Sequence, residues 1–454
     1  MPSINCGIDI GSTNLKIVFV DESGRVILTR SVPTPRIFDE FGPVTNPLDL
    51  ISTLETMIIS GWQDIGSPIP LRSIAAAGVG EDGICVNTNC EPLGHAIPWF
   101  DKRASAEVIE FKKYQYLISK TGIKIDETQT ATKWLWLNRH RPNEINRAMP
   151  WVTLTDFPAV WWSGKTFMSA SLAPRTGCFN VHDRNWVSEL LDAAKAPLLP
   201  QIKQAGETIG HVRNGRLRES GAVSGDTILV AGGHDHPVAA TMIRRLDPNG
   251  RVDSMGTANL IYGETIHFNN STLTKDLAFS VPPAGHGISC LGVLELSAEL
   301  NSLPNAFELR TFLAQEHLVG APPKSYNELQ ASLCDNELAV RRRLELMSLK
   351  ARRLLTSMDK AGVPAGQIYT TGGWSRSKSL VELRASIFGQ KILALGELEL
   401  TATGAALFGA QAASGKSLCP IEKSDIKIIS PIAEWAEQYQ QIFNIIDRNS
   451  IEPP

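Results

Sequence analysis

The sequence predicts an α/β protein built from two similar domains, and three observations lead to this prediction. The chain has 454 residues, which corresponds to two or three domains at about 150 residues each. Short apolar segments of strand character alternate with longer segments of helical periodicity. A glycine hairpin near the N-terminus is echoed near the middle of the chain. A turn-rich break over 246–250 predicts domains at 1–246 and 247–454.

The composition is that of a globular protein and excludes several functional classes. Hydrophobic residues make up 43% and charged residues 20%, and the net charge is −3. This balance argues against nucleic acid as the main partner. No apolar run reaches the roughly 20 residues of a membrane helix, and the N-terminus lacks the pattern of a secretory signal. The seven scattered cysteines match no zinc or disulfide framework, so a cytoplasmic protein is expected.

The first element expected is a β-hairpin whose turn could bind phosphate. Residues 4–10 and 15–20 are predicted strands, and the turn between them is Gly11-Ser12-Thr13-Asn14. A Walker A or Rossmann loop would instead lead from a strand into a helix. Backbone N–H groups and hydroxyls of such a turn suit an anion, and Asp9 could hold a hydrated cation. The alternative is an ordinary hairpin with a polar turn.

A similar turn occurs 245 residues later. The segment Gly256-Thr257-Ala258-Asn259-Leu260 matches Gly11 to Leu15, and an aspartate, Asp9 or Asp253, lies shortly before each glycine. A match of five residues suggests two similarly built domains, in which two facing hairpins would clamp a phosphate.

The remaining elements follow from periodicity and turn residues. A strand is expected over 73–80, before Glu81-Asp82-Gly83, and another over 228–231. The helix over 336–358 carries a basic face that either is solvated or binds an anion. The segment 399–413 predicts a helix of small residues that packs closely against another element. Further helices are expected over 104–120, 129–140 and 237–245, and a strand over 367–371.

The run Gly232-Gly233-His234-Asp235-His236-Pro237 is consistent with three interpretations. The two histidines could chelate a metal, or the segment could be a structural turn in which Asp235 caps a helix. The third is a catalytic carboxylate at a strand-to-helix turn, which a kinase needs to accept the proton of an alcohol. Two phosphate-type hairpins in the same chain favour the third interpretation.

Taken in order, these motifs resemble the FGGY carbohydrate kinases of the sugar kinase, Hsp70 and actin superfamily. The resemblance covers residues 4–415 and implies two actin-like (ribonuclease H-like) domains with a catalytic cleft between them. It implies ATP and Mg²⁺ as cofactors and a sugar, ketose or polyol as substrate. The motifs are Gly7–Thr13 with Lys16, Trp99–Ala104, the Gly-Gly-His-Asp-His-Pro run, Met255–Ala258, Thr371–Ser377, and Glu399 with Gly404–Ala406.

The resemblance also assigns roles to individual residues. Asp235 matches the general base, and Asp9 matches a carboxylate near the metal. Trp99, Asp101 and Arg103 match a segment near the sugar, where an indole face and paired charges suit carbohydrate binding; for Trp99 the alternative is a core aromatic. The residues that match nucleotide or phosphate contacts are Gly11, Ser12, Thr13, Lys16, Gly256, Thr257, Gly372, Gly373 and Ser377.

Glu81 and Asp82 depart from the family pattern, because many members have a Ser-x-Gln-x-His-Gly-like run there. The acidic pair is our candidate for substrate selection, through altered hydroxyl contacts or by receiving a cationic group. The alternative is that both carboxylates face solvent in a turn.

The expected enzyme phosphorylates a hydroxyl of a small sugar or polyol. Two other functions are weighed against it: an actin-like ATPase switch, and a non-catalytic sugar-sensing pseudokinase. The partners expected are the sugar or polyol and, as one option for assembly, a second chain in a homodimer.

Overall fold

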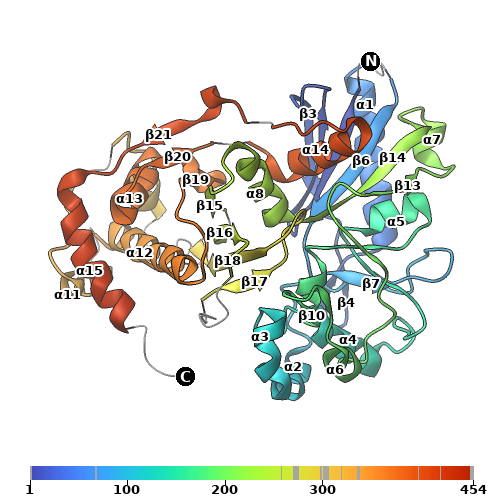
Figure 1. Cartoon of the computed structure of the whole chain (residues 1–454), viewed down its shortest axis with the longest axis horizontal. Helices are drawn as coiled ribbons and strands as arrows, with labels where there is room; N and C mark the ends of the chain where they lie inside the picture. Colours follow the sequence, from blue (N-terminus) through green and yellow to red (C-terminus); the bar gives the residue numbers. More distant parts are fainter. Residues whose placement is uncertain are drawn as a thin grey trace. The chain divides into compact units, whose positions relative to one another are not determined.

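The chain folds into two units, each built around one mixed β-sheet (Figure 1), as the predicted α/β class with two similar domains requires. The computed structural model describes residues 3–66, 69–256, 258–268, 276–296, 299, 306–317, 320–334, 338–396, 398–419 and 421–449. The first unit comprises Met1–Met242, Phe279–Ser289 and Glu399–Pro420, and the second comprises Ile243–Ala278, Cys290–Leu398 and Ile421–Pro454. The limits 1–246 and 247–454 stay a prediction, and the observed units differ from it at 243–246, 279–289 and 399–420.

The sheet of the first unit has the order β13-β14-β6-β1-β2-β3. β1 is antiparallel to β2 and parallel to β6, and β6 is parallel to β14. The first two N-terminal strands form the hairpin that the apolar runs and the turn predicted, and β3 extends it to a meander. The strands are β1 (Asn5–Ile10), β2 (Asn14–Val20), β3 (Val26–Pro33), β6 (Leu71–Gly78), β13 (Thr208–His211) and β14 (Val223–His234).

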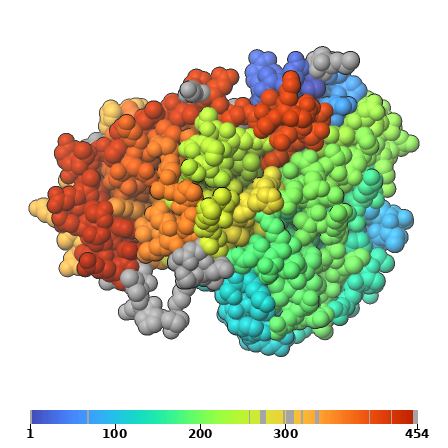
Figure 2. Space-filling model, in the orientation of Figure 1, coloured from blue at the N-terminus to red at the C-terminus, as the bar shows by residue number. Residues whose placement is uncertain are grey.

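The helix of small residues packs directly on β1, as its composition predicted. α14 (Leu400–Ser414) approaches β1 so closely that a Cβ at Gly7 would lie 1.8 Å from the Ala402 carbonyl oxygen. In the space-filling view α14 (red) lies beside the dark blue N-terminal strands, although the two come from opposite ends of the chain (Figure 2). This packing brings the start of α14 to the end of β1 where the first turn begins.

Helices and small hairpins complete the first unit. The predicted helix over 104–120 is interrupted, because the chain tightens to a 3₁₀ turn at Lys112–Leu117, where Gln115 accepts a hydrogen bond from the Ile125 N–H. The helices are α1 (Pro47–Asp64), α2 (Ser105–Phe111), α3 (Ile118–Thr121), α4 (Thr130–His140), α5 (Phe157–Ser163), α6 (Ser188–Ala193), α7 (Arg216–Glu219) and α8 (Asp235–Leu246), which runs on into the second unit. The short strands are β4 (Ile37–Asp39), β5 (Gly42–Val44), β7 (Gly83–Cys85), β8 (Trp151–Thr153), β9 (Met168–Ser169), β10 (Phe179–Asn180), β11 (Asn185–Trp186) and β12 (Ile202–Lys203).

The second sheet repeats the centre of the first. Its order is β17-β18-β16-β15-β19-β20-β21, with β15 antiparallel to β16 and parallel to β19, and β19 parallel to β20. β15 and β16 thus correspond to β1 and β2. The strands are β15 (Arg251–Met255), β16 (Asn259–Thr265), β17 (Ala278–Ser280), β18 (Ile288–Leu294), β19 (Ile368–Thr371), β20 (Ile392–Ala394) and β21 (Lys427–Ile429).

For the long helix α12 (Ala339–Lys360), the prediction of a solvated basic face is wrong in part. Arg341 and Arg342 are buried, and both donate to Glu345, at 2.9 and 2.8 Å. Neighbouring helices cover this side of α12, so the two guanidinium groups lie inside the second unit and pair with a buried carboxylate. The other helices of the unit are α10 (Ala306–Leu313), α11 (Tyr326–Ala331), α13 (Lys378–Phe388) and α15 (Ala436–Asn449).

No helix in the described ranges is both long enough and apolar enough to cross a membrane.

Candidate active site

The turn between β1 and β2 is held by backbone hydrogen bonds. The Gly11 N–H donates to the Asn14 carbonyl at 3.1 Å. A Cβ at Gly11 would lie 2.7 Å from the same carbonyl oxygen, so the turn requires glycine. Ser12 is half-buried and Thr13 is exposed, which leaves the hydroxyl-bearing part of the turn accessible to an anion.

Three charged side chains meet at the base of this turn. Lys16 Nζ lies 2.5 Å from Glu399 Oε2 and 3.6 Å from Asp9 Oδ2. Asp9 and Lys16 face each other across the β1–β2 pair, and Glu399 arrives as the N-cap of α14. The predicted pair Asp9 and Lys16 is therefore together, with Glu399 as a third member.

The cluster carries more negative charge than Lys16 alone can offset. Burial, followed by the nearby Glu399 and Asp235, raises the pKa of Asp9 to about 8, against the lowering effect of Lys16. A divalent cation beside Asp9 would relieve this repulsion. Within the described residues no three metal-ligating side chains converge. A site with few protein carboxylates still suits Mg²⁺, because this ion keeps several waters and substrate phosphates as ligands.

Asp235 is the first residue of α8, which starts two residues earlier than predicted. The preceding Gly233 adopts a φ of 144°, and a Cβ there would lie 2.3 Å from Ser171 Oγ, so the sharp approach to Asp235 requires glycine. The same Ser171 hydroxyl accepts the His234 N–H at 2.9 Å. The strand-to-helix turn thus has a fixed shape.

One oxygen of Asp235 is engaged and the other is not. Oδ1 accepts the His236 N–H at 2.7 Å, and the His234 and His236 Nε2 atoms lie 3.4 and 3.8 Å from it. No hydrogen bond from the described part of the chain reaches Oδ2. Burial acts to raise the pKa of Asp235, but His236, His234 and Arg175 together hold it below its usual value. The carboxylate is therefore ionised near neutral pH with one oxygen available as a proton acceptor.

Glu81 is buried, so the alternative of a solvent-facing turn residue is wrong for it. Its Oε1 accepts two N–H groups of Arg175, one of them Nε at 2.7 Å. Burial alone would raise the pKa of Glu81, but Arg175 and then His234 bring it below its usual value. Glu81 is thus committed to an internal ion pair.

Asp82 is also buried, and it has a different environment. Its Oδ1 accepts no hydrogen bond from the described residues. Burial raises the pKa of Asp82 to about 6, opposed by Lys133 and Arg36. Lys133 is itself buried, and its Nζ donates to the Ile97 and Pro98 carbonyls at 3.3 and 2.9 Å. The two acids therefore face internal cations already, which argues against a cationic group on the substrate.

We predict that Glu81→Gln destabilises the protein by about 3 kcal/mol, at the low end for a buried ion pair because Arg175 retains some exposure. Chemical denaturation with a constant m-value measures this loss. Glu110→Gln is the matched control, because Glu110 makes its ion pair with Arg139 at the surface. An equal loss in the two variants would contradict a structural role for Glu81.

The segment predicted to lie near the sugar divides into an exposed ring and a buried ion pair. Trp99 is 38% exposed, so it is not a core aromatic. Arg103 binds both Asp101 oxygens, each at 2.9 Å, and also donates to Asp39 Oδ2 at 3.0 Å. Asp101 and Arg103 thus shape the loop, and Trp99 is the accessible member.

In the second unit the two predicted turns lie against each other. A Cβ at Gly372 would lie 2.6 Å from the Met255 carbonyl oxygen, so the 372–377 segment touches the turn at Gly256. Gly373 has open space around its Cα, and Ser377 caps α13 by accepting the Leu380 N–H at 3.3 Å. Thr257 lies outside the described residues.

Asp253 differs from its apparent counterpart Asp9. The second turn is one residue shorter, since Met255 pairs with Asn259 whereas Ile10 pairs with Leu15. Asp253 is fully buried between Arg384 Nη1, 3.0 Å from its Oδ2, and Asn259 Nδ2, 2.5 Å from its Oδ1. It therefore fixes the hairpin, a role that the sequence analysis does not assign to it.

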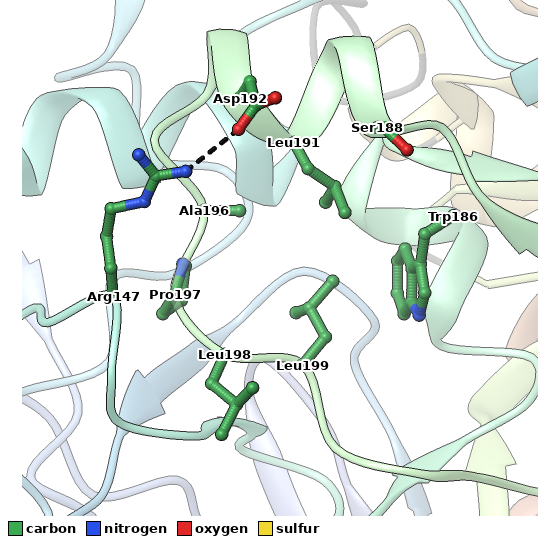
Figure 3. Close-up of a pocket in the computed structure, with 9 residues that line it drawn as sticks. All are labelled: Arg147, Trp186, Ser188, Leu191, Asp192, Ala196, Pro197, Leu198 and Leu199. Atoms are coloured by element: carbon green, nitrogen blue, oxygen red, sulfur yellow. Dashed lines mark hydrogen bonds and ion pairs between the residues drawn. The ribbon is translucent and has the colours of Figure 1, made fainter.

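A separate pocket of about 330 Å³ opens on the first unit (Figure 3). Leu191, Leu198 and Leu199 face the opening beside Trp186, and Arg147 pairs with Asp192 at 3.0 Å on the rim. None of the candidate site residues lines it.

Comparisons with known proteins show similarity in sequence and in fold. Residues 4–241 match the model of the FGGY family of carbohydrate kinases, N-terminal domain, and residues 322–413 match the C-terminal domain. A xylulose kinase of Lactococcus lactis subsp. lactis (strain IL1403) is 23% identical over 97% of this chain and 95% of its own. An L-fuculokinase of Escherichia coli (strain K12) is 23% identical over 88% and 91%. The crystal structure of a xyloylose kinase from Brucella ovis has a TM-score of 0.85 at 18% identity, over 98% of each chain.

Proposed function

Because this chain belongs to the FGGY family of carbohydrate kinases, we propose that it transfers the γ-phosphoryl group of ATP to a hydroxyl of a small sugar, ketose or polyol, with Asp235 as general base. The observation that carries the proposal is the Asp235 carboxylate, ionised and with Oδ2 available, at the start of α8.

In the proposed step Asp235 Oδ2 accepts the proton of the acceptor hydroxyl. As the O–H bond breaks, the acceptor oxygen forms a bond to the γ-phosphorus, and the bond from that phosphorus to the β–γ bridging oxygen breaks. ADP leaves with the bridging oxygen, and the proton stays on Asp235 until solvent removes it. The N-terminus of α8 adds a positive dipole where the transferring group is negative.

The nucleotide side of the proposal assigns the two glycine turns to phosphate. Gly11, Ser12 and Thr13, with Lys16 beneath them, bind phosphate oxygens in the first unit. In the second unit the proposed nucleotide or phosphate contacts are Gly256, Thr257, Gly372, Gly373 and Ser377. Asp9 would hold Mg²⁺, which supplies charge neutralisation on the phosphates when bound.

The acceptor side is proposed to lie between Trp99 and Asp82. An exposed indole gives an apolar face for the C–H side of a sugar ring. Asp82 Oδ1, buried without a partner in the described chain, would accept a hydrogen bond from a substrate hydroxyl. The neighbouring charges of Glu81 and Asp82 are offset by Arg175, Lys133 and Arg36, so an uncharged polyhydroxylated acceptor fits best.

Asp82→Asn tests this assignment without disturbing the Glu81 ion pair. We expect kcat/KM for the preferred acceptor to fall about 10- to 150-fold, the value of one hydrogen bond to a charged group, and the rank order of substrates to change. The measurement is a coupled ADP-release screen over ketopentoses, deoxyketoses, tetritols and glycerol. Asp64→Asn, at an exposed ion pair, is the matched control. An unchanged rank order would remove Asp82 as a selector and leave Trp99 in that role.

The match to carbohydrate kinases at both ends of the chain favours this activity over an actin-like ATPase switch or a sugar-sensing pseudokinase.

A further inference from the structure

A short segment, Thr34 to Asp39, which we call the strap, forms hydrogen bonds to the first glycine turn. The Thr34 N–H donates to the Thr13 carbonyl at 2.9 Å, and the Thr34 hydroxyl donates to the Gly11 carbonyl at 2.7 Å. Arg36 Nη2 donates to the Ser12 carbonyl at 2.8 Å. Three consecutive carbonyls of the turn are therefore held by one segment of chain.

The same strap also contacts the acceptor segment, which we define as residues 97–103. Asp39 Oδ2 accepts Arg103 Nη1 at 3.0 Å, and Arg103 is itself bound to Asp101. The guanidinium carbon of Arg36 lies 5.0 Å from the centre of the Phe100 ring, a cation–π distance. The strap thus runs from the phosphate turn to the segment that carries Trp99.

Arg36 takes part in both attachments. Its Nη2 donates to the Ser12 carbonyl of the turn, its Nη1 donates to Thr45 Oγ1 at 3.3 Å, and its guanidinium carbon lies over the Phe100 ring. Its charge also faces Asp82, the proposed hydroxyl acceptor. One side chain therefore contacts both the Ser12 carbonyl and the Phe100 ring of the acceptor segment.

We propose that Arg36 is a positioning residue that couples the phosphate turn to the acceptor segment, so that nucleotide bound at the turn orders residues 97–103. This inference rests on the proposed role of the Gly11 turn in phosphate binding. Because coupling between sites is reciprocal, an acceptor ordered on Trp99 would tighten nucleotide binding by the same factor.

The chemistry of the contact predicts which substitutions break the coupling. Arg36→Met keeps most of the side-chain volume but loses the charge and both hydrogen bonds. Arg36→Lys keeps a charge over Phe100 and can donate to one carbonyl. It lacks the planar guanidinium group that donates to both Ser12 and Thr45. Coupling should fall in the order arginine, lysine, methionine, which a loss of packing alone would not produce.

The test is amide hydrogen exchange of the full-length protein with and without saturating AMPPNP, a non-hydrolysable ATP analogue, and Mg²⁺. In the wild type we expect amide exchange to slow in the turn peptide, 9–16. We expect exchange in the acceptor segment to slow about fivefold or more. In Arg36→Met the turn peptide should still be protected, whereas protection of 97–103 should fall below about twofold. Arg36→Lys should lie between the two.

Arg30→Met is the matched control, because Arg30, on strand β3, makes a surface ion pair with Asp64 of α1. It should reproduce the wild-type pattern. Protection of 97–103 that survives in Arg36→Met, or that is missing in the wild type while the turn is protected, overturns the coupling alone. If AMPPNP protects no turn peptide in the wild type, the proposed phosphate role of the turn fails, and the coupling fails with it.

Discussion

Replacing Asp235 with Asn should lower kcat by about 10²- to 10⁴-fold, the usual contribution of a general base. The amide keeps the size of the side chain and cannot accept the hydroxyl proton at neutral pH. The loss should appear in kcat at saturating acceptor, measured by coupled ADP release. AMPPNP binding, measured by calorimetry, should stay within a few-fold of the wild type, since no nucleotide contact is assigned to this side chain.

Asp226→Asn is a matched control, because Asp226 is an exposed residue near the far end of the same strand, β14. Its kcat should equal that of the wild type. Near-normal turnover in Asp235→Asn, on an acceptor that the wild type phosphorylates well, would remove Asp235 from the role of base.

Replacing Gly256 with Val should weaken nucleotide binding about 10- to 150-fold, as expected when a charge-assisted hydrogen bond between backbone and phosphate is lost. The structure indicates that this substitution tests nucleotide binding separately from folding. The nearest atom to an added Cβ is the Ala258 carbonyl oxygen at 3.7 Å, an ordinary contact, so the variant should fold. At Gly11 the same change would strain the turn itself, since the nearest carbonyl oxygen is 2.7 Å away. Calorimetry with AMPPNP measures the affinity.

Gly225→Val is the control for this variant, because an added Cβ there meets only the flexible end of Arg218 at 3.3 Å. Its nucleotide affinity should match that of the wild type. A folded Gly256→Val protein with unchanged AMPPNP affinity would contradict the assignment of the second turn to phosphate.

The sequence predicted those parts of the fold whose signals are local. Alternating apolar strands around Gly11-Ser12-Thr13-Asn14, and their echo at Gly256, indicated two similar domains, and the two sheets share their central strand order. The close packing of α14 followed from its small residues. The start of α8 was placed two residues late, because Pro237 marks a first turn without fixing which residue opens it.

The sequence could not predict contacts between residues far apart in the chain. Arg175, the partner of Glu81, lies in a short 3₁₀ helix, Ala173–Thr176, that has no motif, and Lys133 occupies a helical position that its residue type would place at the surface. Asp9 and Asp253 look alike in sequence, yet Asp9 lies two residues before its glycine and Asp253 three, so they lie on opposite faces of their strands, and Asp253 forms a buried ion pair with Arg384. Such roles depend on register and burial, which periodicity does not specify.

The central claim is that Asp235 drives phosphoryl transfer from ATP to a carbohydrate hydroxyl, and acceptor-dependent ADP release tests it most directly. Wild-type and Asp235→Asn proteins are assayed with ATP and Mg²⁺, alone and with each sugar or polyol of the screen. We predict slow ADP release without acceptor and at least a hundredfold stimulation by one of the acceptors in the wild type, with that stimulation lost in Asp235→Asn. Equal ADP release with and without every acceptor, or equal stimulation in both proteins, would contradict the account.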